Sequence, residues 1–367
     1  MKVAIVHDWF VWSGGAERVV EALLELYPEA DLFSLVDFYP ESQRRRFLFG
    51  KKATTTFIQK LPGAKKHFRN YLPLFPLAIE QLDLRGYDLV ISSSHAVAKG
   101  VKTFPGQAHL CYCYTPMRYA WDQEEEYFEG HAVLGLKKWF LKYVFHRIRI
   151  WDVVSSHRVD RFVAISHLVG ERIRRYYGRD SLLLYPPVDI HRFRLHRDKD
   201  NFYLTASRLV PYKKVRMIVK AFARNGRRLL VVGEGPELET LQQIATENVS
   251  ILGYCEEEKL INLMQRARGF VYAAYEDFGI VPVEAMACGT PVIAYGAGGV
   301  LDTVVEGETG VFFPEQTPES LNRALDLFEA MDFDPERISA HAQRFGRDNF
   351  KKAFEETIDS SIPSTRK

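Results

Sequence analysis

Short apolar runs alternate with amphipathic segments along most of the chain. The first run, residues 3–6, is rich in β-branched side chains, and a Gly14-Gly15 pair and a helix-periodic segment up to Leu24 follow it. This order predicts a strand, a glycine loop and a helix, which is how a doubly wound α/β domain begins. The pattern predicts further strands in this half at residues 30–35, 89–92, 109–113 and 162–165, and a helix at residues 169–177.

A proline pair, Pro186-Pro187, and a charged segment over residues 191–201 interrupt the alternation. We interpret this stretch as a linker, because proline cannot donate to a strand ladder and a highly charged segment cannot build a core. Beyond it, strands are expected at residues 201–207, 228–232, 249–252, 270–274 and 291–294, and helices at residues 215–224, 237–245, 257–266 and 282–287.

The sequence therefore predicts an α/β fold with two Rossmann-like, doubly wound parallel-sheet domains in series. We place the first domain at residues 1–190 and the second at residues 191–345. Residues 346–367 are expected to form a C-terminal helix or tail that could pack back on the first domain. The length of 367 residues and the 47% content of hydrophobic residues agree with two domains that each bury a large core.

The net charge of +2 hides an asymmetry between the two halves. Residues 1–190 carry 26 Lys and Arg against 21 Asp and Glu, a surplus of five, whereas the remaining residues have a net charge of −3. The near-balance argues against a protein defined by nucleic-acid binding. The basic excess gathers in residues 44–69 and 131–151, where aromatic residues interleave with the cations. Such segments suit shallow binding to an anionic bilayer, while ordinary solvated faces or packing on the same domain are the alternatives.

The four cysteines, Cys111, Cys113, Cys255 and Cys288, have the spacing of neither a disulfide scaffold nor a zinc site. The N-terminus lacks the long apolar core of a signal peptide, and no run of 18 uncharged apolar residues occurs. We expect a cytoplasmic protein, with the option of a peripheral position at the inner face of the membrane.

Two features of the second half are typical of a site for an anionic ligand. Arg208 and Lys213 follow an expected strand, at the edge where open α/β sheets bind ligands, and both side chains suit phosphate. A glycine turn at residues 233–236 follows the next strand. The alternative for the two cations is that they are solvated loop residues, and glycine turns of this kind are common without a ligand.

A third feature lies in residues 275–292. Glu276 is expected at a strand end and Glu284 in the first turn of the following helix, so that the two carboxylates converge. Gly279 lets the backbone approach a ligand, and the amides of residues 278–281 can face an anion with the helix dipole behind them. The structural alternative is that one carboxylate caps the helix and the other complements its dipole.

The string from Glu276 to Glu284 resembles the E-x7-E signature of retaining, family-4-type glycosyltransferases of the GT-B fold. The spacing of Arg208 and Lys213, the glycine turn, and Gly298-Gly299 ahead of Asp302 resemble the same family. Four segments of the first half resemble bacterial mannosyltransferases that build O-antigen and related polysaccharides from GDP-mannose. These segments are residues 2–21, 91–96, 112–122 and 164–166. The resemblance implies two Rossmann-like domains that face a cleft, with the acceptor in the first and the nucleotide sugar in the second.

The resemblance also implies a role for each matching residue. Arg208 and Lys213 match a clamp on the donor diphosphate that replaces a metal ion, and Glu276 matches the carboxylate that binds donor-sugar hydroxyls. Glu284 matches the group that holds the ribose, and His95 matches a histidine that reaches the donor sugar; a satisfied loop histidine is the alternative. The remaining donor-binding candidates are Gly14, Gly15, Gly235, Phe278, Gly279, Ile280 and Val281. The resemblance implies no metal site and no cofactor.

Two positions depart from the family pattern: Lys214 stands where many relatives carry glycine, and Asp302 stands where they usually carry glutamate. The segment around Pro116 supplies three acceptor-side candidates, Tyr114, Met117 and Arg118. For Tyr114 and Met117, packing inside the domain core is an equally open alternative.

We therefore expect a metal-independent, retaining hexosyltransferase that moves a sugar to a hydroxyl of a growing glycan or lipid-linked oligosaccharide. By the resemblance the donor is GDP-mannose and the route is front-face attack, in which the leaving phosphate takes the acceptor proton. A UDP-hexose donor, a nucleotide-sugar epimerase or hydrolase, and a non-enzymatic nucleotide-sugar binder are the alternatives. An NAD-dependent oxidoreductase is disfavoured because Gly14-Gly15 does not continue into G-x-G-x-x-G.

Overall fold

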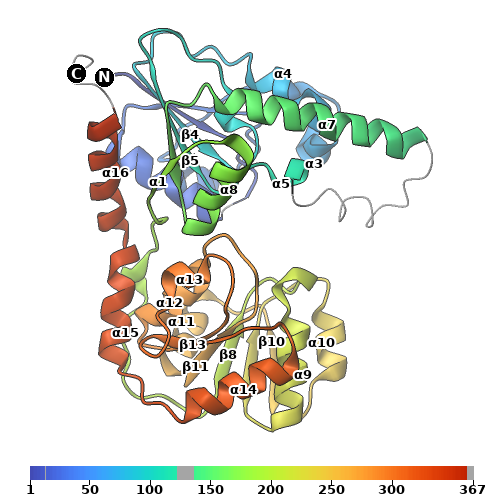
Figure 1. Cartoon of the computed structure of the whole chain (residues 1–367), viewed down its shortest axis with the longest axis vertical. Coiled ribbons are helices and arrows are strands. Elements are labelled where there is room, and N and C mark those ends of the chain that lie inside the picture. The colour runs from blue at the N-terminus through green and yellow to red at the C-terminus, as the bar shows by residue number, and fades with distance from the viewer. Residues whose placement is uncertain (13, 122–135, 362–367) are drawn as a thin grey trace. The chain divides into compact units, whose positions relative to one another are not determined.

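The computed structural model describes residues 1–12, 14–121 and 136–361, and the chain divides into two compact units (Figure 1). The first unit contains residues 1–186 together with the C-terminal residues from Phe350 onward, and the second contains residues 187–349. Parts of two expected segments, residues 122 and 131–135, and the tail beyond residue 361 lie outside the described residues.

Seven parallel strands form the sheet of the first unit, in the order β3-β2-β1-β4-β5-β6-β7. Every residue of β1, β4 and β5 is buried, which explains why these strands, apart from His7 and His109, are continuous runs of apolar and small residues. The chain builds outward from β1 to β3 and then returns to the other side of β1 at β4. The strand order therefore reverses between β1 and β4, which is where open α/β sheets bind ligands. The strands are β1 (Val3–His7), β2 (Asp31–Ser34), β3 (Thr54–Thr55), β4 (Leu89–Ser94), β5 (Ala108–Cys113), β6 (Arg161–Ala164) and β7 (Ser181–Leu183).

The helices of the first unit begin and end where the local chemistry favours it. Ser166 caps α8 because its side chain accepts a hydrogen bond from the Val169 amide, and Gly178 ends the helix in a left-handed conformation. The α-helices are α1 (Gly15–Leu26), α2 (Glu41–Phe47), α3 (Ala64–His67), α4 (Phe75–Ile79), α5 (Arg118–Trp121), α7 (Leu136–Ser156) and α8 (His167–Tyr177). The 3₁₀ turns are η1 (Phe57–Lys60), η2 (Phe68–Leu74) and η3 (Ala98–Gly100). Helix α16 (Arg347–Ser361) adds Phe350, whose ring packs against that of Tyr112 with centroids 5.7 Å apart.

Six parallel strands form the sheet of the second unit, in the order β10-β9-β8-β11-β12-β13, and the order reverses between β8 and β11. The strands are β8 (Tyr203–Ala206), β9 (Leu229–Val232), β10 (Val249–Gly253), β11 (Gly269–Tyr272), β12 (Val292–Tyr295) and β13 (Gly310–Phe313). The α-helices are α9 (Val215–Asn225), α10 (Leu238–Ile244), α11 (Glu257–Arg266), α12 (Ile280–Ala287), α13 (Val300–Thr303), α14 (Pro318–Glu329) and α15 (Pro335–Ala342). The 3₁₀ turns are η4 (Ile190–Arg192), η5 (Pro211–Lys213) and η6 (Gln343–Phe345).

The predicted α/β class with two parallel sheets is confirmed, and every expected strand and helix overlaps an observed one. Two details at the candidate site were wrong. Strand β11 ends at Tyr272, because its pairing with β12 stops there, so Glu276 lies in the following loop and not at the strand end. Helix α12 begins at Ile280, which moves Glu284 out of its first turn.

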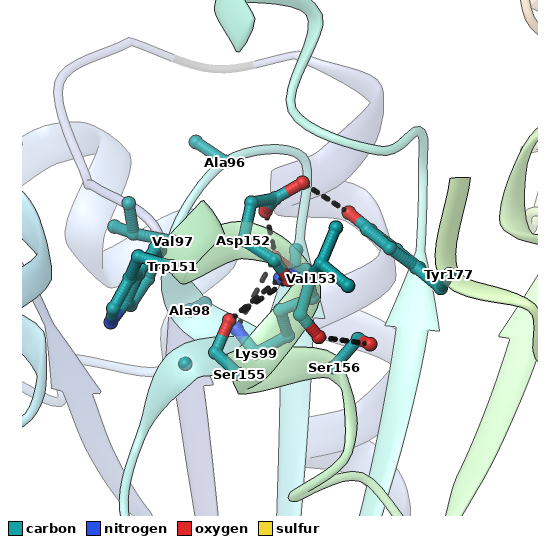
Figure 2. Close-up of polar contacts among 12 residues, drawn as sticks. Ala96, Val97, Ala98, Lys99, Trp151, Asp152, Val153, Ser155, Ser156 and Tyr177 are labelled. Atoms are coloured by element: carbon teal, nitrogen blue, oxygen red, sulfur yellow. Dashed lines mark hydrogen bonds and ion pairs between the residues drawn. The ribbon is translucent and has the colours of Figure 1, made fainter. Parts of the chain in front are cut away.

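A buried ion pair anchors the segment that follows β4 (Figure 2). The Lys99 ammonium lies 2.8 Å from Asp152 Oδ1 and also donates to the Asp152 carbonyl and to Ser155 Oγ on α7. The second carboxylate oxygen of Asp152 accepts hydrogen bonds from Trp121 Nε1 and the Tyr177 hydroxyl, each at 2.9 Å. The two charged side chains are at most 2% exposed. This single cluster connects η3, α5, α7 and α8.

We expect Lys99→Met to destabilise the first unit by about 3–5 kcal/mol, because it leaves the Asp152 carboxylate buried without a cation. Urea denaturation followed by tryptophan fluorescence measures this, since all five tryptophans lie before residue 152 and report on the first unit. The double variant Lys99→Met/Asp152→Asn should lose less stability than the sum of the two single variants. Lys102→Met, which removes an exposed partner of Glu80, is the control and should change stability little. Additive costs for Lys99 and Asp152 would contradict the coupling.

Candidate active site

Three loops of the second unit gather the predicted donor-binding residues at one edge of its sheet. They follow β8, β9 and β11, the strands at and beside the point where the strand order reverses. Arg208 and Lys213 lie in the first loop, Gly235 in the second and Glu276 in the third. The gathering of these loops at one edge is therefore a property of the sheet topology.

Both oxygens of the Glu276 carboxylate have partners. The Lys213 ammonium forms an ion pair with Oε1, and the Tyr272 hydroxyl donates a hydrogen bond to Oε2. Burial and then the charge of Glu276 raise the pKa of Tyr272 well above its usual value, so this hydroxyl stays protonated and remains a donor. The Lys213 and Glu276 side chains are 13% and 28% exposed, whereas Arg208 is exposed on the same loop as Lys213. A carboxylate held from two sides presents a fixed acceptor at the sheet edge.

Glycines allow these loops to touch through their backbones. A Cβ atom on Gly233 would lie 1.8 Å from the Ser207 carbonyl oxygen, and one on Gly235 would lie 2.3 Å from the Leu209 carbonyl oxygen. Both glycines have positive φ angles, 141° and 155°. The glycine turn after β9 is therefore needed to pack against the loop that carries Arg208 and Lys213.

The loop that carries Glu276 is held in a similar way. The amide of Gly299 donates to the Glu276 carbonyl at 2.8 Å, and a Cβ atom on Gly299 would lie 2.2 Å from the Asp277 carbonyl oxygen. The loop ends at Gly279, which has a φ of 90° and precedes α12. The first amides of a helix have no acceptor within the helix, so those that open α12 are suited to an anion.

Glu284 and Lys214 complete the predicted positions in this unit. Glu284 is half-buried on α12, and its charge, after the larger effect of Glu257, contributes to the raised pKa of Arg192. Lys214 precedes α9 with a φ of 57°, a left-handed conformation that favours glycine. The backbone at Lys214 therefore has a conformation that glycine adopts more readily than lysine.

In the first unit, the buried carboxylate of Asp8 shapes the turn that carries His95. The amides of residues 95–98 all donate to it, at 2.6–3.0 Å, and His95 Nδ1 lies 2.9 Å from Oδ2. Burial favours the neutral acid, but the charge of His95 and its hydrogen bond outweigh that effect and hold the pKa of Asp8 well below its usual value. Burial likewise opposes charge on His95, but Asp8 raises the pKa of His95 above its usual value.

The Gly14-Gly15 pair opens α1 close to this turn. Glu17 accepts a hydrogen bond from the Gly14 amide at 2.8 Å, and its other oxygen lies 3.6 Å from Nε2 of buried His7. The Tyr114 hydroxyl forms hydrogen bonds with Ser93 Oγ at 2.8 Å and the Ala16 carbonyl at 3.1 Å. The glycine pair, Tyr114 and the end of β4 are thereby brought together.

The other two acceptor-side candidates differ in their surroundings. Met117 is completely buried and belongs to the core of the first unit, which supports the packing alternative for this residue. Arg118 is half-buried at the beginning of α5. Asp8 and Tyr272 are the polar residues of these sites that the sequence did not identify. Asp8 directly follows β1 at a ligand-binding edge, which is a signal that could have found it, whereas Tyr272 resembles any core residue of a strand.

Two family models match the chain in succession. The model for glycosyltransferase family 4 matches residues 13–192, and the model for group 1 glycosyl transferases matches residues 188–345. Together they span both units, and the two parallel sheets are those of GT-B structures. The chain belongs to the family 4, group 1 glycosyltransferases of the GT-B fold.

Several characterised proteins are similar to parts or all of this chain. A GDP-mannose-dependent monoacylated α-(1-6)-phosphatidylinositol monomannoside mannosyltransferase of Corynebacterium glutamicum is 37% identical over 50% of this chain and 55% of its own length. The O-antigen chain mannosyltransferase RfbU of Salmonella typhimurium is 24% identical over 58% of this chain and 63% of its own length. The chain thus matches little more than half the length of these relatives. HepE of Anabaena, solved in complex with UDP, has the same fold, with a TM-score of 0.70, 19% identity and coverage of 98% of this chain and 100% of that one.

We expect the imidazole of His95 to keep its proton to a higher pH than the ordinary pKa of about 6.5 and to lose it as the pH rises through the raised value. In Asp8→Asn the pKa of His95 should fall, because the anion that raises it most is removed while burial and the nearby Arg69 cation, which lower it, remain beside the smaller effect of Glu17. NMR titration of the histidine side chains measures both values. His109, whose pKa burial lowers to about 4, is the internal control for an intact fold. An unchanged His95 titration in Asp8→Asn would contradict this account.

Proposed function

We propose that the chain is a retaining glycosyltransferase that moves a hexosyl group from a nucleotide sugar to a hydroxyl of a glycan or lipid-linked oligosaccharide. One observation carries the proposal: the Glu276 carboxylate is held by Lys213 and Tyr272 at the reversal point of a parallel sheet, beside the start of α12. Family membership supports the reaction type.

The proposed roles follow from charge and position. Arg208 and Lys213 neutralise the charge that grows on the leaving diphosphate, together with the amides that open α12 (residues 278–281) and the loop at Gly235. Glu276 accepts hydrogen bonds from hydroxyls of the donor sugar, and Glu284 holds the ribose. In the first unit, Gly14, Gly15 and His95 serve the reacting sugar, and Tyr114 and Arg118 are the acceptor-side candidates.

The proposed reaction is a front-face substitution. The bond between the anomeric carbon and the leaving phosphate oxygen breaks, and the bond to the acceptor oxygen forms on the same face. The acceptor proton passes to the leaving phosphate, so that neither Glu276 nor Glu284 needs to act as a base. The clamp residues then hold the nucleoside diphosphate product, whose added negative charge they neutralise.

Mannose from GDP-mannose is the proposed donor. The names of the mannosyltransferases from Corynebacterium glutamicum and Salmonella typhimurium support it. A UDP-hexose is the second candidate, because Anabaena HepE was also solved with UDP-glucose and with UDP and glucose. The proposed contacts concern the phosphates and the sugar, and none of them distinguishes guanine from uracil.

We expect GDP-mannose to raise the melting temperature of the wild-type protein more than UDP-glucose does, since a ligand stabilises the state that binds it. Glu276→Ala should bind the nucleoside diphosphate as before but transfer sugar about a hundredfold or more slowly, because the donor sugar loses its positioning contact. A panel of nucleotide sugars, scored by thermal shift and by release of nucleoside diphosphate, measures both effects. Stabilisation by UDP-glucose alone would contradict the assignment of GDP-mannose as the donor. Wild-type turnover in Glu276→Ala would contradict the proposed role of Glu276.

Peripheral contact with an anionic membrane is a further part of the proposal, and the outer face of α7 supports it. Trp139, Tyr143, Ile150 and Val154 recur at helical spacing and are between 46% and 75% exposed, while Val144, Phe145 and Ile148 face the core. Exposed cations, Lys142 and Arg147, lie on the same stretch of helix. No helix among the described residues is long and apolar enough to cross a membrane.

We expect the protein to sediment with vesicles that contain anionic lipid and much less with neutral vesicles at low salt, since each surface cation contributes about 1 kcal/mol near an anionic bilayer. The variant Trp139→Ser/Tyr143→Ser should lose most of this binding. Leu327→Ser, which removes from α14 an apolar side chain about as exposed as that of Tyr143, is the control and should bind normally. Equal recovery with neutral and anionic vesicles would contradict membrane contact.

A further inference from the structure

A cation that the proposed mechanism does not use lies on a platform of aromatic rings in the first unit. The guanidinium of Arg69, on η2, is 4.8 Å from the ring centroid of Trp12, 5.5 Å from that of Phe68 and 5.8 Å from that of Trp9. Stacking on rings restricts the guanidinium to one orientation and leaves its N–H edge available for hydrogen bonds. Arg69 is exposed, and Trp12 is 48% exposed, so solvent reaches both.

The surroundings of Arg69 do not neutralise its charge. Among the residues that the structure describes, Arg69 forms no ion pair with a carboxylate. Residues 51–79 contain six Lys and Arg and no Asp or Glu, and Lys65 and Lys66 on α3 are exposed close by in the sequence. The buried carboxylates of Asp8 and Glu17 lie near the adjoining His95, but neither pairs with Arg69, so its guanidinium remains available to an anion.

The platform adjoins the residues proposed to serve the reacting sugar. The buried ring of Trp9, which Arg69 contacts, also contacts the His95 ring edge-on with centroids 4.6 Å apart. Trp9 directly follows Asp8, the carboxylate that fixes the His95 turn, and Trp12 precedes Gly14 by two positions. One indole therefore connects Arg69 to the edge of the sheet where the strand order reverses.

We propose that Arg69, stacked on Trp9 and Trp12, is a binding subsite for a phosphate or diphosphate group of the acceptor. The guanidinium edge pairs with two phosphate oxygens, and the exposed face of Trp12 covers the part of the acceptor next to the phosphate. The inference rests on the proposed transferase function, because it assigns the acceptor and not the donor to this unit. It requires a charged acceptor, such as a lipid-diphosphate-linked sugar, and disfavours a neutral free glycan.

Octyl diphosphate is a suitable probe, because it carries the proposed group without a sugar. Its binding is measured by quenching of tryptophan fluorescence in the full chain with Arg208→Ala/Lys213→Ala, so that the proposed donor clamp does not bind the probe. Adding Arg69→Gln should weaken binding about tenfold, as expected for the loss of charge-assisted hydrogen bonds. Arg174→Gln, a change at an exposed arginine of α8 paired with Asp180, is the matched control and should bind the probe normally.

Equal affinity for octyl diphosphate with and without Arg69 would overturn the subsite. A loss of binding to anionic vesicles in Arg69→Gln, without a change in affinity for octyl diphosphate, would also overturn it and assign Arg69 to a lipid surface. Failure of the wild-type protein to turn over any nucleotide sugar would refute the transferase function itself, whatever the probe shows.

Discussion

A single buried carboxylate, Asp8, fixes the shape of the first unit at the point where its strand order reverses. It accepts hydrogen bonds from four successive amides and lies against the His95 imidazole. A buried carboxylate without such partners costs several kcal/mol, so the turn cannot open while Asp8 remains ionised. The same turn continues into Lys99, which the buried Asp152 holds. Two buried anions therefore determine where His95 stands and how the turn connects to α7.

The second unit also has its candidate residues where the strand order reverses, but its loops are held by different contacts. These loops are held mainly by backbone contacts at glycines. Lys213 and Glu276 balance each other's charge there, and Tyr272 adds a neutral donor. Charged side chains at this edge thus remain partly exposed and close to one another, as a site for an anionic substrate requires.

The sequence was sufficient to predict the class of fold, because each strand is a compact apolar run and each helix has an apolar face with the right period. It also identified most of the candidate site, because the E-x7-E string is specific in spacing and residue type. It misplaced the end of β11, since Ala273 and Ala274 continue the apolar run although their pairing has stopped. It missed Asp8, although the position directly after β1 was a usable signal, because the partner amides begin 87 residues away. It could not identify Tyr272, which resembles any core residue of a strand until the fold shows its hydrogen bond to Glu276. The burial of Met117 was likewise undecided by pattern alone.

Gly298 and Gly299 support the backbone of the loop that carries Glu276. Main-chain atoms of residues 276–278 lie directly against these glycines, so the course of the loop depends on backbone contacts as well as on the buried side chain of Phe278. An exposed side chain such as that of Tyr275 does not contribute to these backbone contacts. A scaffold of this kind can present different exposed side chains at the sheet edge, while the rest of the unit keeps its packing.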